Sequence, residues 1–281
     1  MSLHFRPLNE VIGAEVLGVD LSQPMSDETF ERVHQTWLER TILLFREQKM
    51  SVEEHIAFTR RLGDLEIHTL PKYNLPYHPE IFVVSNVIKD GRPIGAPKSG
   101  HHWHSDSQYL KKPSAGSLLH AREVPAEGGD TLFTNLFAAY DALPEETKRK
   151  IEGLKVLHSR VKAWSISYPD RAPMTEEEKE RVPDVIHPLV RTHPETGRKA
   201  LWVGGNVAWE IVGMHEQEGR ALIRELREFA IQSRFVYRHQ WRVGDAILWD
   251  NRSTMHCATP FDEERYRRVM YRTTVAGDEP F

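Results

Sequence analysis

Cysteine is almost absent from this 281-residue chain, which contains one, Cys257. A single cysteine forms neither an internal disulfide nor a cysteine-rich zinc module, and the lack of disulfides fits a reducing compartment. No uninterrupted apolar run approaches about 18 residues, so no membrane span is expected. The first residues, Met1 to Arg6, lack the apolar stretch of a secretory signal. We therefore expect a cytoplasmic protein with no membrane contact.

An excess of positive charge is also missing, since the net charge is −4 and the sequence pI is near 6.4. Too few cations are available to neutralise many phosphates, so no nucleic-acid partner is expected. The chain has no Walker-type phosphate loop, no dinucleotide fingerprint and no Gly-x-Ser-x-Gly nucleophile turn. The helix start at His215 lacks the second histidine of a zinc protease.

The remaining pattern predicts one domain over residues 1–281, because no repeat, linker or low-complexity segment divides the chain. Helical spacing of apolar residues and short β-rich runs predict a mainly β fold with helical decoration (α+β), a double-sheet jelly roll. Helices are expected over 27–39, 51–62, 138–154 with a break at Pro144, and 215–233. Strands are expected over 14–21, 41–45, 81–87, 115–121, 131–133, 185–192, 199–203, 235–241, 246–249 and 268–275. The acidic segment 174–188 fits either a surface insertion, which we favour slightly, or a loop over an active site.

Histidines and an aspartate are concentrated in residues 100–107. On an extended strand, residues two apart face the same side, so His104 and Asp106 would present an imidazole next to a carboxylate. His256, which follows the apolar run 245–249, is the best candidate for a third ligand. Two histidines and one carboxylate form the facial triad of oxygen-activating Fe(II) sites. His102 has the same parity and is expected beside the site rather than on the metal.

Two arginines, Arg268 and Arg272, share the parity of one strand face near the C-terminus. Two guanidiniums on one face can bind two separate carboxylate or oxyanion groups. The alternative is a basic strand edge that faces solvent.

These motifs together resemble the taurine/2,4-dichlorophenoxyacetate dioxygenase family of Fe(II)- and 2-oxoglutarate-dependent oxygenases. The resemblance spans nearly the whole chain. It is carried by Trp103-His104-Ser105-Asp106, Gly128-Gly129-Asp130-Thr131, Trp249-Asp250-Asn251-Arg252, His256, and Arg268 to Arg272. It implies a double-stranded β-helix fold, the jelly-roll variant of that family.

Site roles follow from the same resemblance. His104, Asp106 and His256 match the iron ligands, and Arg268 and Thr131 match the groups that bind the distal carboxylate of 2-oxoglutarate. Arg272 matches the residue that binds the anionic group of the substrate. His68 matches a histidine that contacts the substrate, and Trp164 matches an aromatic residue of the substrate pocket. The implied cofactor and cosubstrates are Fe(II), 2-oxoglutarate and dioxygen.

The activity implied is hydroxylation of a small organic anion, a sulfonate, sulfate ester or aryloxy or carboxylic acid, often with carbon–heteroatom cleavage, releasing succinate and carbon dioxide. The carboxylate of Asp106 favours hydroxylation over halogenation. A homo-oligomer, a dimer or tetramer, is expected.

The resemblance to the taurine enzymes weakens in the substrate pocket. This chain has Thr69-Leu70-Pro71 where the taurine enzymes have a tyrosine, and Gly100 where they have an asparagine. Trp164 and Val207 fall near positions that are phenylalanines in those enzymes. Losing polar groups that satisfy a buried ammonium disfavours taurine, so an acid with an apolar or aromatic body is expected. Two alternatives stay open: a taurine dioxygenase releasing sulfite and aminoacetaldehyde, and a jelly-roll metal- or anion-binding protein without oxygenase activity.

Overall fold

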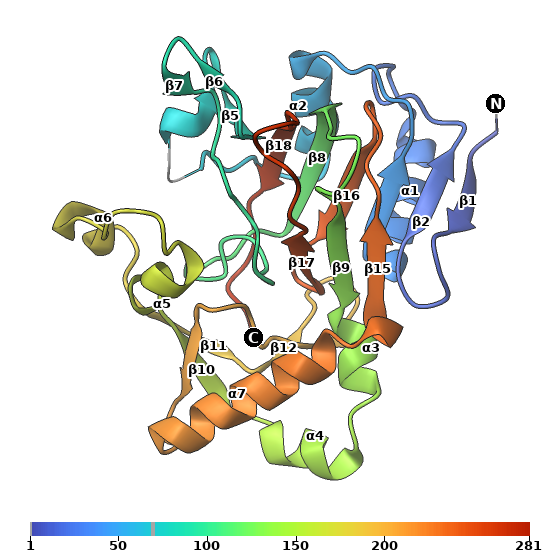
Figure 1. The fold of residues 1–281 in the computed structure, drawn as a ribbon. Coiled ribbons are helices and arrows are strands. Elements are labelled where there is room, and N and C mark those ends of the chain that lie inside the picture. The colour runs from blue at the N-terminus through green and yellow to red at the C-terminus, as the bar shows by residue number, and fades with distance from the viewer. Residues whose placement is uncertain (1, 69–70) are drawn as a thin grey trace.

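The computed structural model describes residues 2–68 and 71–281 of the chain, and its centre is a large eight-stranded sheet (Figure 1). Neighbouring strands of this sheet are antiparallel except for the parallel pair β2 and β3. In spatial order the strands are β1 (His4–Pro7), β2 (Ala14–Leu17), β3 (Ile42–Phe45), β16 (Ala246–Asp250), β8 (Gly116–Glu123), β18 (Val269–Val275), β5 (His78–Ser85) and β4 (Asn74–Leu75).

A smaller sheet packs against the inner face of the large one. Its strands, in spatial order, are β15 (Val236–His239), β9 (Thr131–Asn135) and β17 (Thr254–Ala258). Phe133 of β9 belongs to the same buried cluster as Leu119 of β8, Trp249 of β16 and Met270 of β18. Two sheets that bury one shared core form the jelly roll that the sequence predicted.

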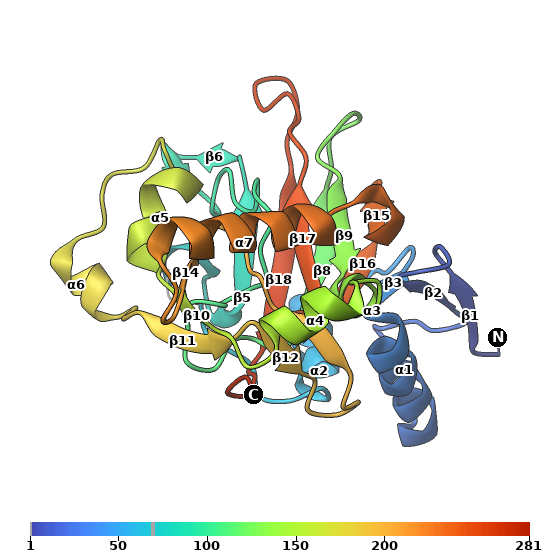
Figure 2. The same ribbon diagram turned by 90° about the horizontal axis from the view of Figure 1, so that it is seen from below.

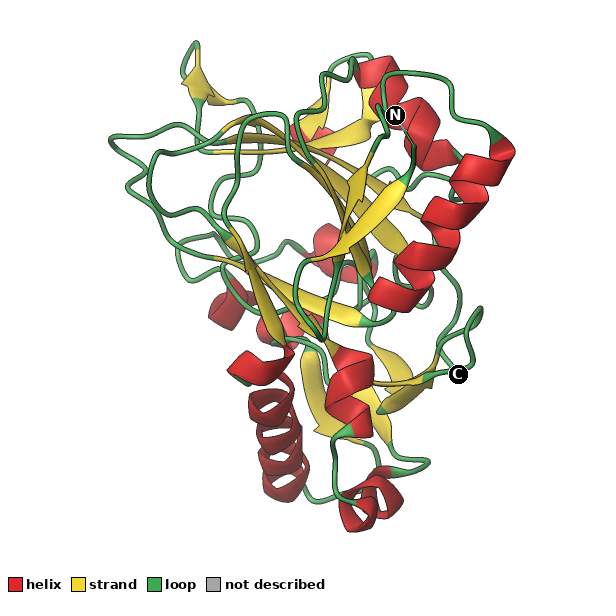
Figure 3. Cartoon of the chain, turned by 90° about the vertical axis from the view of Figure 1, so that its right-hand side faces the viewer, coloured by secondary structure: helices red, strands yellow, loops and turns green. Residues whose placement is uncertain are grey.

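Two neighbouring strands of the large sheet, β3 and β16, are apolar at almost every position because both of their faces are buried. Leu119 and Ile247 point into the core between the sheets, whereas Leu118 and Leu248 pack on the opposite face. Helices α1 (Asp27–Arg40) and α2 (Val52–Arg60) cover that opposite face. Figure 3 shows these helices outside the strands.

Most of the other helices lie in one long excursion between β9 and β15, which lies below and beside the sheets in Figure 1 and in front of them in Figure 2. Its elements are α3 (Leu136–Asp141), α4 (Glu145–Ile151), β10 (Lys155–His158), α5 (Arg160–Ser167), α6 (Glu176–Glu180), β11 (Val185–Pro188), β12 (Val190–Thr192), β13 (Lys199–Leu201), β14 (Ala208–Ile211), α7 (Glu216–Ala230) and the 3-10 turn η2 (Ser233–Phe235). The remaining short elements are η1 (Pro71–Tyr73), β6 (Ile88–Lys89) and β7 (Arg92–Pro93).

Several local predictions are confirmed in detail. The capping box of α2 is present, with Ser51 Oγ accepting from the Glu54 amide and Glu54 accepting from the Ser51 amide. Pro144 separates α3 from α4, since it cannot supply the amide that a continuous helix needs. The segment 174–188 carries the short helix α6, which has no buried residue, although Met174, Val182 and His187 of the same segment are buried.

One local prediction is wrong, and one helix was not predicted. Residues 100–107 do not form a regular strand, and His104 makes only one isolated bridge. Helix α5 at 160–167 was not predicted, because its apolar residues give a weak amphipathic pattern. No helix in the described part of the chain is long and apolar enough to cross a membrane.

A buried ionic network holds the turn between β16 and β17. Asp250 accepts two hydrogen bonds from the guanidinium of Arg252, at 2.9 and 2.7 Å, and pairs with His193 Nε2 at 2.9 Å. Arg252 also donates to Glu195 at 2.6 Å. Burial alone would raise the pKa of Asp250, but Arg252 and His193 hold it below its usual range. The network therefore fixes the turn that delivers His256.

We predict that Arg252→Ala lowers the free energy of unfolding by roughly 3–5 kcal/mol, because it leaves Asp250 as a buried charge without its main partner. Urea denaturation followed by circular dichroism measures the change. Arg32→Ala, at an exposed position on α1, is the matched control and should change stability by no more than about 0.5 kcal/mol. A loss below about 1 kcal/mol for Arg252→Ala would contradict the role given to the network.

Candidate active site

The two histidines of the site are brought together by a pair of backbone hydrogen bonds. The His104 amide donates to the His256 carbonyl at 3.0 Å, and the His256 amide donates to the His104 carbonyl at 2.8 Å. This isolated antiparallel bridge places the imidazole centroids 4.2 Å apart. Residues 152 positions apart thus act as direct neighbours, with no regular strand through His104.

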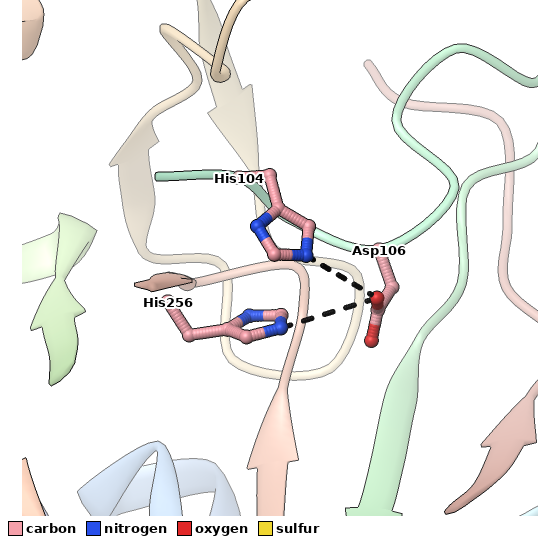
Figure 4. Close-up of side chains that lie close together, drawn as sticks. All are labelled: His104, Asp106 and His256. Carbon is pink, nitrogen blue, oxygen red and sulfur yellow. Dashed lines mark ion pairs between the residues drawn. The ribbon is translucent and has the colours of Figure 1, made fainter. Parts of the chain in front are cut away.

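Asp106 completes a three-residue cluster (Figure 4). Its Oδ1 lies 3.9 Å from His104 Nε2 and 4.0 Å from His256 Nε2, and the three ligand atoms lie within 4.8 Å of one another. These distances are too long for hydrogen bonds. Three donors on one face around an ion at about 2.0–2.2 Å lie roughly 3 Å from one another, so the three side chains have to move slightly inward to hold one ion. Among the described residues, this is the one group of three such side chains with that spacing.

The protonation states fit a metal ligand set. His104 Nδ1 lies 2.7 Å from the His102 carbonyl, so it carries the proton and leaves the lone pair of Nε2 for a metal. Burial, followed by the proximity of His256, lowers the pKa of His104 to about 3, and burial lowers that of His256 to about 4. Two neutral imidazoles and a carboxylate match the donor set that Fe(II) oxygenases use.

A hydrogen-bonded chain orients the Asp106 carboxylate. Ser117 Oγ donates to Asp106 Oδ2 at 2.7 Å, which leaves Oδ1 directed at the histidines. Asn251 bonds to Ser117 Oγ at 3.1 Å, and its own oxygen accepts from the Asp106 amide and from Trp249 Nε1. The Trp249–Asn251 part of the sequence motif therefore supports the ligand without belonging to the cluster itself.

Arg272 lies at the border between this cluster and an open pocket. Its guanidinium donates to Asp106 Oδ1 at 2.7 Å and lies 5.1 Å from the Phe82 ring centroid. Burial alone would raise the pKa of Asp106, but Arg272 and both histidines lower it overall. Arg272 thus keeps the carboxylate ionised.

Arg268 lines the same pocket, as the parity of the strand predicted. It precedes β18 directly and is only 6% exposed, yet its guanidinium forms no ion pair with any described residue. Burial lowers its pKa to about 10, while Asp130 acts in the opposite direction. A buried cation without a partner is costly unless an anion joins it. Thr131 lines the pocket nearby and accepts a hydrogen bond from Trp241 at 2.9 Å.

The residues predicted to contact the substrate also line this pocket. His68 stacks on Phe82 with ring centroids 4.0 Å apart, and Trp164 lies on α5. Gly100 and Val207 are part of the same lining. The sequence comparison placed Thr69-Leu70-Pro71 where the taurine enzymes have a tyrosine; Thr69 and Leu70 lie outside the described residues.

Four further side chains of the site were missed from the sequence. Ser117 is one residue of an apolar strand, and only its register against Trp249 places it beside the metal cluster. Arg160, Tyr168 and Arg171 line the pocket from α5 and the loop after it. No local pattern marks Arg160, Tyr168 or Arg171, because their contacts depend on how the excursion folds back over the sheets.

A jelly roll that holds two histidines and a carboxylate, beside a buried arginine with no ion pair to any described residue, is the arrangement expected of a non-haem iron oxygenase. The chain belongs to the taurine catabolism dioxygenase TauD, TfdA family, whose model matches residues 4–274.

Three relatives illustrate the similarity. The 2,4-dichlorophenoxyacetate dioxygenase of Cupriavidus pinatubonensis, dependent on alpha-ketoglutarate, is 35% identical, and the match covers 98% of both chains. The (S)-phenoxypropionate/alpha-ketoglutarate-dioxygenase of Sphingobium herbicidovorans is 36% identical over 97% of this chain and 94% of its own. The crystal structure of AAD-2 with Mn(II) and N-oxalylglycine matches with a TM-score of 0.85 and 36% identity, covering 100% of this chain and 99% of that one.

These matches confirm the predicted family and the predicted jelly roll. The chain is an Fe(II)- and 2-oxoglutarate-dependent dioxygenase that consumes dioxygen. The alternative of a binding protein without oxygenase activity is set aside.

We predict that Ser117→Ala weakens Fe(II) binding by about 10- to 100-fold, because it frees the Asp106 carboxylate to rotate away from the histidines. Equilibrium dialysis under nitrogen measures the affinity. Ser253→Ala removes a buried hydroxyl that has no hydrogen-bond partner in the described structure, and it should leave the affinity unchanged. Equal affinities for both variants would show that Ser117 does not orient the ligand.

Proposed function

We propose that this dioxygenase holds one Fe(II) with His104, Asp106 and His256 and hydroxylates a small aryloxy or related organic acid. The observation that carries the proposal is one pocket lined by the three-residue cluster, by Arg268 and Arg272, and by apolar side chains. We further propose that residues 1–281 form one catalytic domain, which the length of the family match supports.

Arg268 and Thr131 would bind the distal carboxylate of 2-oxoglutarate. The buried guanidinium provides the charge, and the Thr131 hydroxyl, fixed as an acceptor for Trp241, can turn its proton toward a carboxylate. Both lie in the same pocket as the three metal ligands. An anion bound here would neutralise the cation that the described residues leave without an ion pair.

With iron bound, 2-oxoglutarate and dioxygen supply an oxidant that yields succinate, carbon dioxide and a hydroxylated substrate. The chain's own residues position the substrate for this step. Arg272 would hold the acid group, His68 and Phe82 would flank the chain of the substrate, and the lining side chains would restrict water. A hydroxyl placed on a carbon that bears an ether oxygen forms a hemiacetal, which collapses to a phenol and an oxo acid or aldehyde.

The lining supports an acid with an apolar or aromatic body. Phe82, Leu119, Trp164 and Val207 provide the apolar surface. The described lining contains four arginines and only one carboxylate, that of Asp106. This balance attracts anions and repels the ammonium of taurine, so taurine is the weaker candidate. The named activities of the two relatives on aryloxy acids agree with this choice.

We also propose a cytoplasmic homo-oligomer, a dimer or tetramer, with neither nucleic acid nor membrane as a partner. The single cysteine and the net charge of −4 support this setting. Sedimentation measures the oligomeric state directly.

We predict succinate formation with 2,4-dichlorophenoxyacetate or 2-phenoxypropionate that exceeds the rate without substrate by at least about 10-fold, with release of the phenol. Taurine should stay near the rate without substrate, because the described lining offers its ammonium no carboxylate other than that of Asp106. Each candidate substrate is incubated with the enzyme, Fe(II) and 2-oxoglutarate, and the succinate and phenol formed are measured. Efficient sulfite release from taurine, with no turnover of aryloxy acids, would overturn the proposal.

We predict that Arg268→Gln raises the KM for 2-oxoglutarate by about 10- to 100-fold, because one charge-assisted bond to the carboxylate is lost. Arg265→Gln is the control, since Arg265 is exposed and should give the KM of the unmodified enzyme. Initial rates at varied concentrations of 2-oxoglutarate measure the KM of each variant. An unchanged KM in Arg268→Gln would remove Arg268 from the cosubstrate site.

A further inference from the structure

The pocket carries more positive charge than the proposed iron and cosubstrate chemistry uses. Arg268 is assigned to 2-oxoglutarate and Arg272 to the substrate, which leaves Arg160 and Arg171 on the same lining. Asp106 is the one carboxylate among the described lining residues, and it faces the metal ligands. Two additional guanidiniums at the wall formed by α5 therefore call for a separate explanation.

Of Arg160 and Arg171, Arg160 is the better placed to bind a ligand in the pocket. It is the first residue of α5, directly after the N-cap Ser159, and is only 8% exposed. Its guanidinium carbon lies 4.3 Å from the ring centroid of Tyr109 and 5.7 Å from that of Trp164. Two aromatic rings at these distances help to hold the guanidinium in a fixed orientation.

Arg171 is held differently, at the end of the same wall. It donates to the Pro97 carbonyl at 2.9 Å and stacks on Tyr168 at 4.2 Å. It lies in the loop after α5 and is less buried than Arg160. Arg171 thus secures the loop, whereas Arg160 faces the pocket interior.

Arg160 and Arg272 approach the same place from opposite parts of the fold. Arg160 comes from α5 and Arg272 from β18, and both act electrostatically on His68 and on the buried Tyr168. After burial, the two guanidiniums are the main causes that lower the pKa of His68 to about 3. His68 is therefore neutral at pH 7 and adds no competing charge.

We propose that Arg160 is a second anion-binding residue for the substrate, so that the acid group binds between Arg160 and Arg272, beside the Tyr168 hydroxyl. This inference rests on the proposed function and specifies how that pocket selects acids. A carboxylate offers two oxygens, and two guanidiniums from different elements can each bind one of them. Such a subsite selects an acid over its neutral analogue and fixes which carbon faces the metal ligands.

The test compares 2,4-dichlorophenoxyacetate with its uncharged amide, 2,4-dichlorophenoxyacetamide. Calorimetry under nitrogen measures their binding to the enzyme loaded with Fe(II) and 2-oxoglutarate, so that no turnover occurs. Arg160→Gln should weaken binding of the acid by about 10- to 100-fold and leave binding of the amide within about two-fold. Arg160→Lys, which keeps the charge, should recover part of the loss.

Lys162→Gln is the matched control, because Lys162 lies on the same helix with a solvent-exposed side chain paired to Glu210. It should bind the acid as the unmodified enzyme does. In steady state, Arg160→Gln should raise the KM for the acid, with the KM for 2-oxoglutarate unchanged. An equal loss for acid and amide means that Arg160 only packs the wall, and an unchanged affinity for the acid likewise overturns the subsite.

Failure of the proposed function has a separate signature. In that case the unmodified holoenzyme forms no succinate with any aryloxy acid. The Arg160→Gln comparison is then made with hexyl sulfate as the anion, and equal affinities there overturn the subsite as well. Weaker binding of hexyl sulfate by Arg160→Gln supports the subsite independently of the substrate class.

Discussion

The bridge between His104 and His256 is the constraint on which the site depends. Two backbone hydrogen bonds fix the distance between two distant segments and place both imidazoles on one side of the space beside Asp106. Backbone bonds hold this spacing better than side-chain contacts, because they tolerate little change in length or angle. The jelly roll supplies the frame, since β17 carries His256 against β9 inside the core.

Charge burial has two different outcomes in this molecule. Asp250 and Arg252 neutralise each other behind the site and fix the turn that leads to His256. Arg268 is equally buried, yet it has no ion pair with a described residue. The first arrangement stabilises the fold, whereas the second leaves an electrostatic cost that a bound anion removes. That difference separates Arg252 from Arg268.

Much of the fold could be predicted because its signals are local. The capping box at Ser51 and the break at Pro144 each depend on residues within a few positions. The strand expected around His104 was wrong, since residue parity describes a regular strand and this segment makes one bridge followed by turns. Helix α5 was missed because its pattern is weakly amphipathic, and the pocket wall with Arg160 was missed with it.

The sequence by itself determined the residue types: the His-x-Asp pair, the later histidine, the two arginines near the C-terminus, and the family that these imply. Only the tertiary structure decided which atoms meet. It placed Ser117 behind Asp106 and left Arg268 buried without an ion pair to any described residue. It also brought Arg160 to the pocket that Arg272 enters from β18. The physical reason is that ligand chemistry depends on residue identity, whereas orientation and charge balance depend on contacts between segments far apart in the chain.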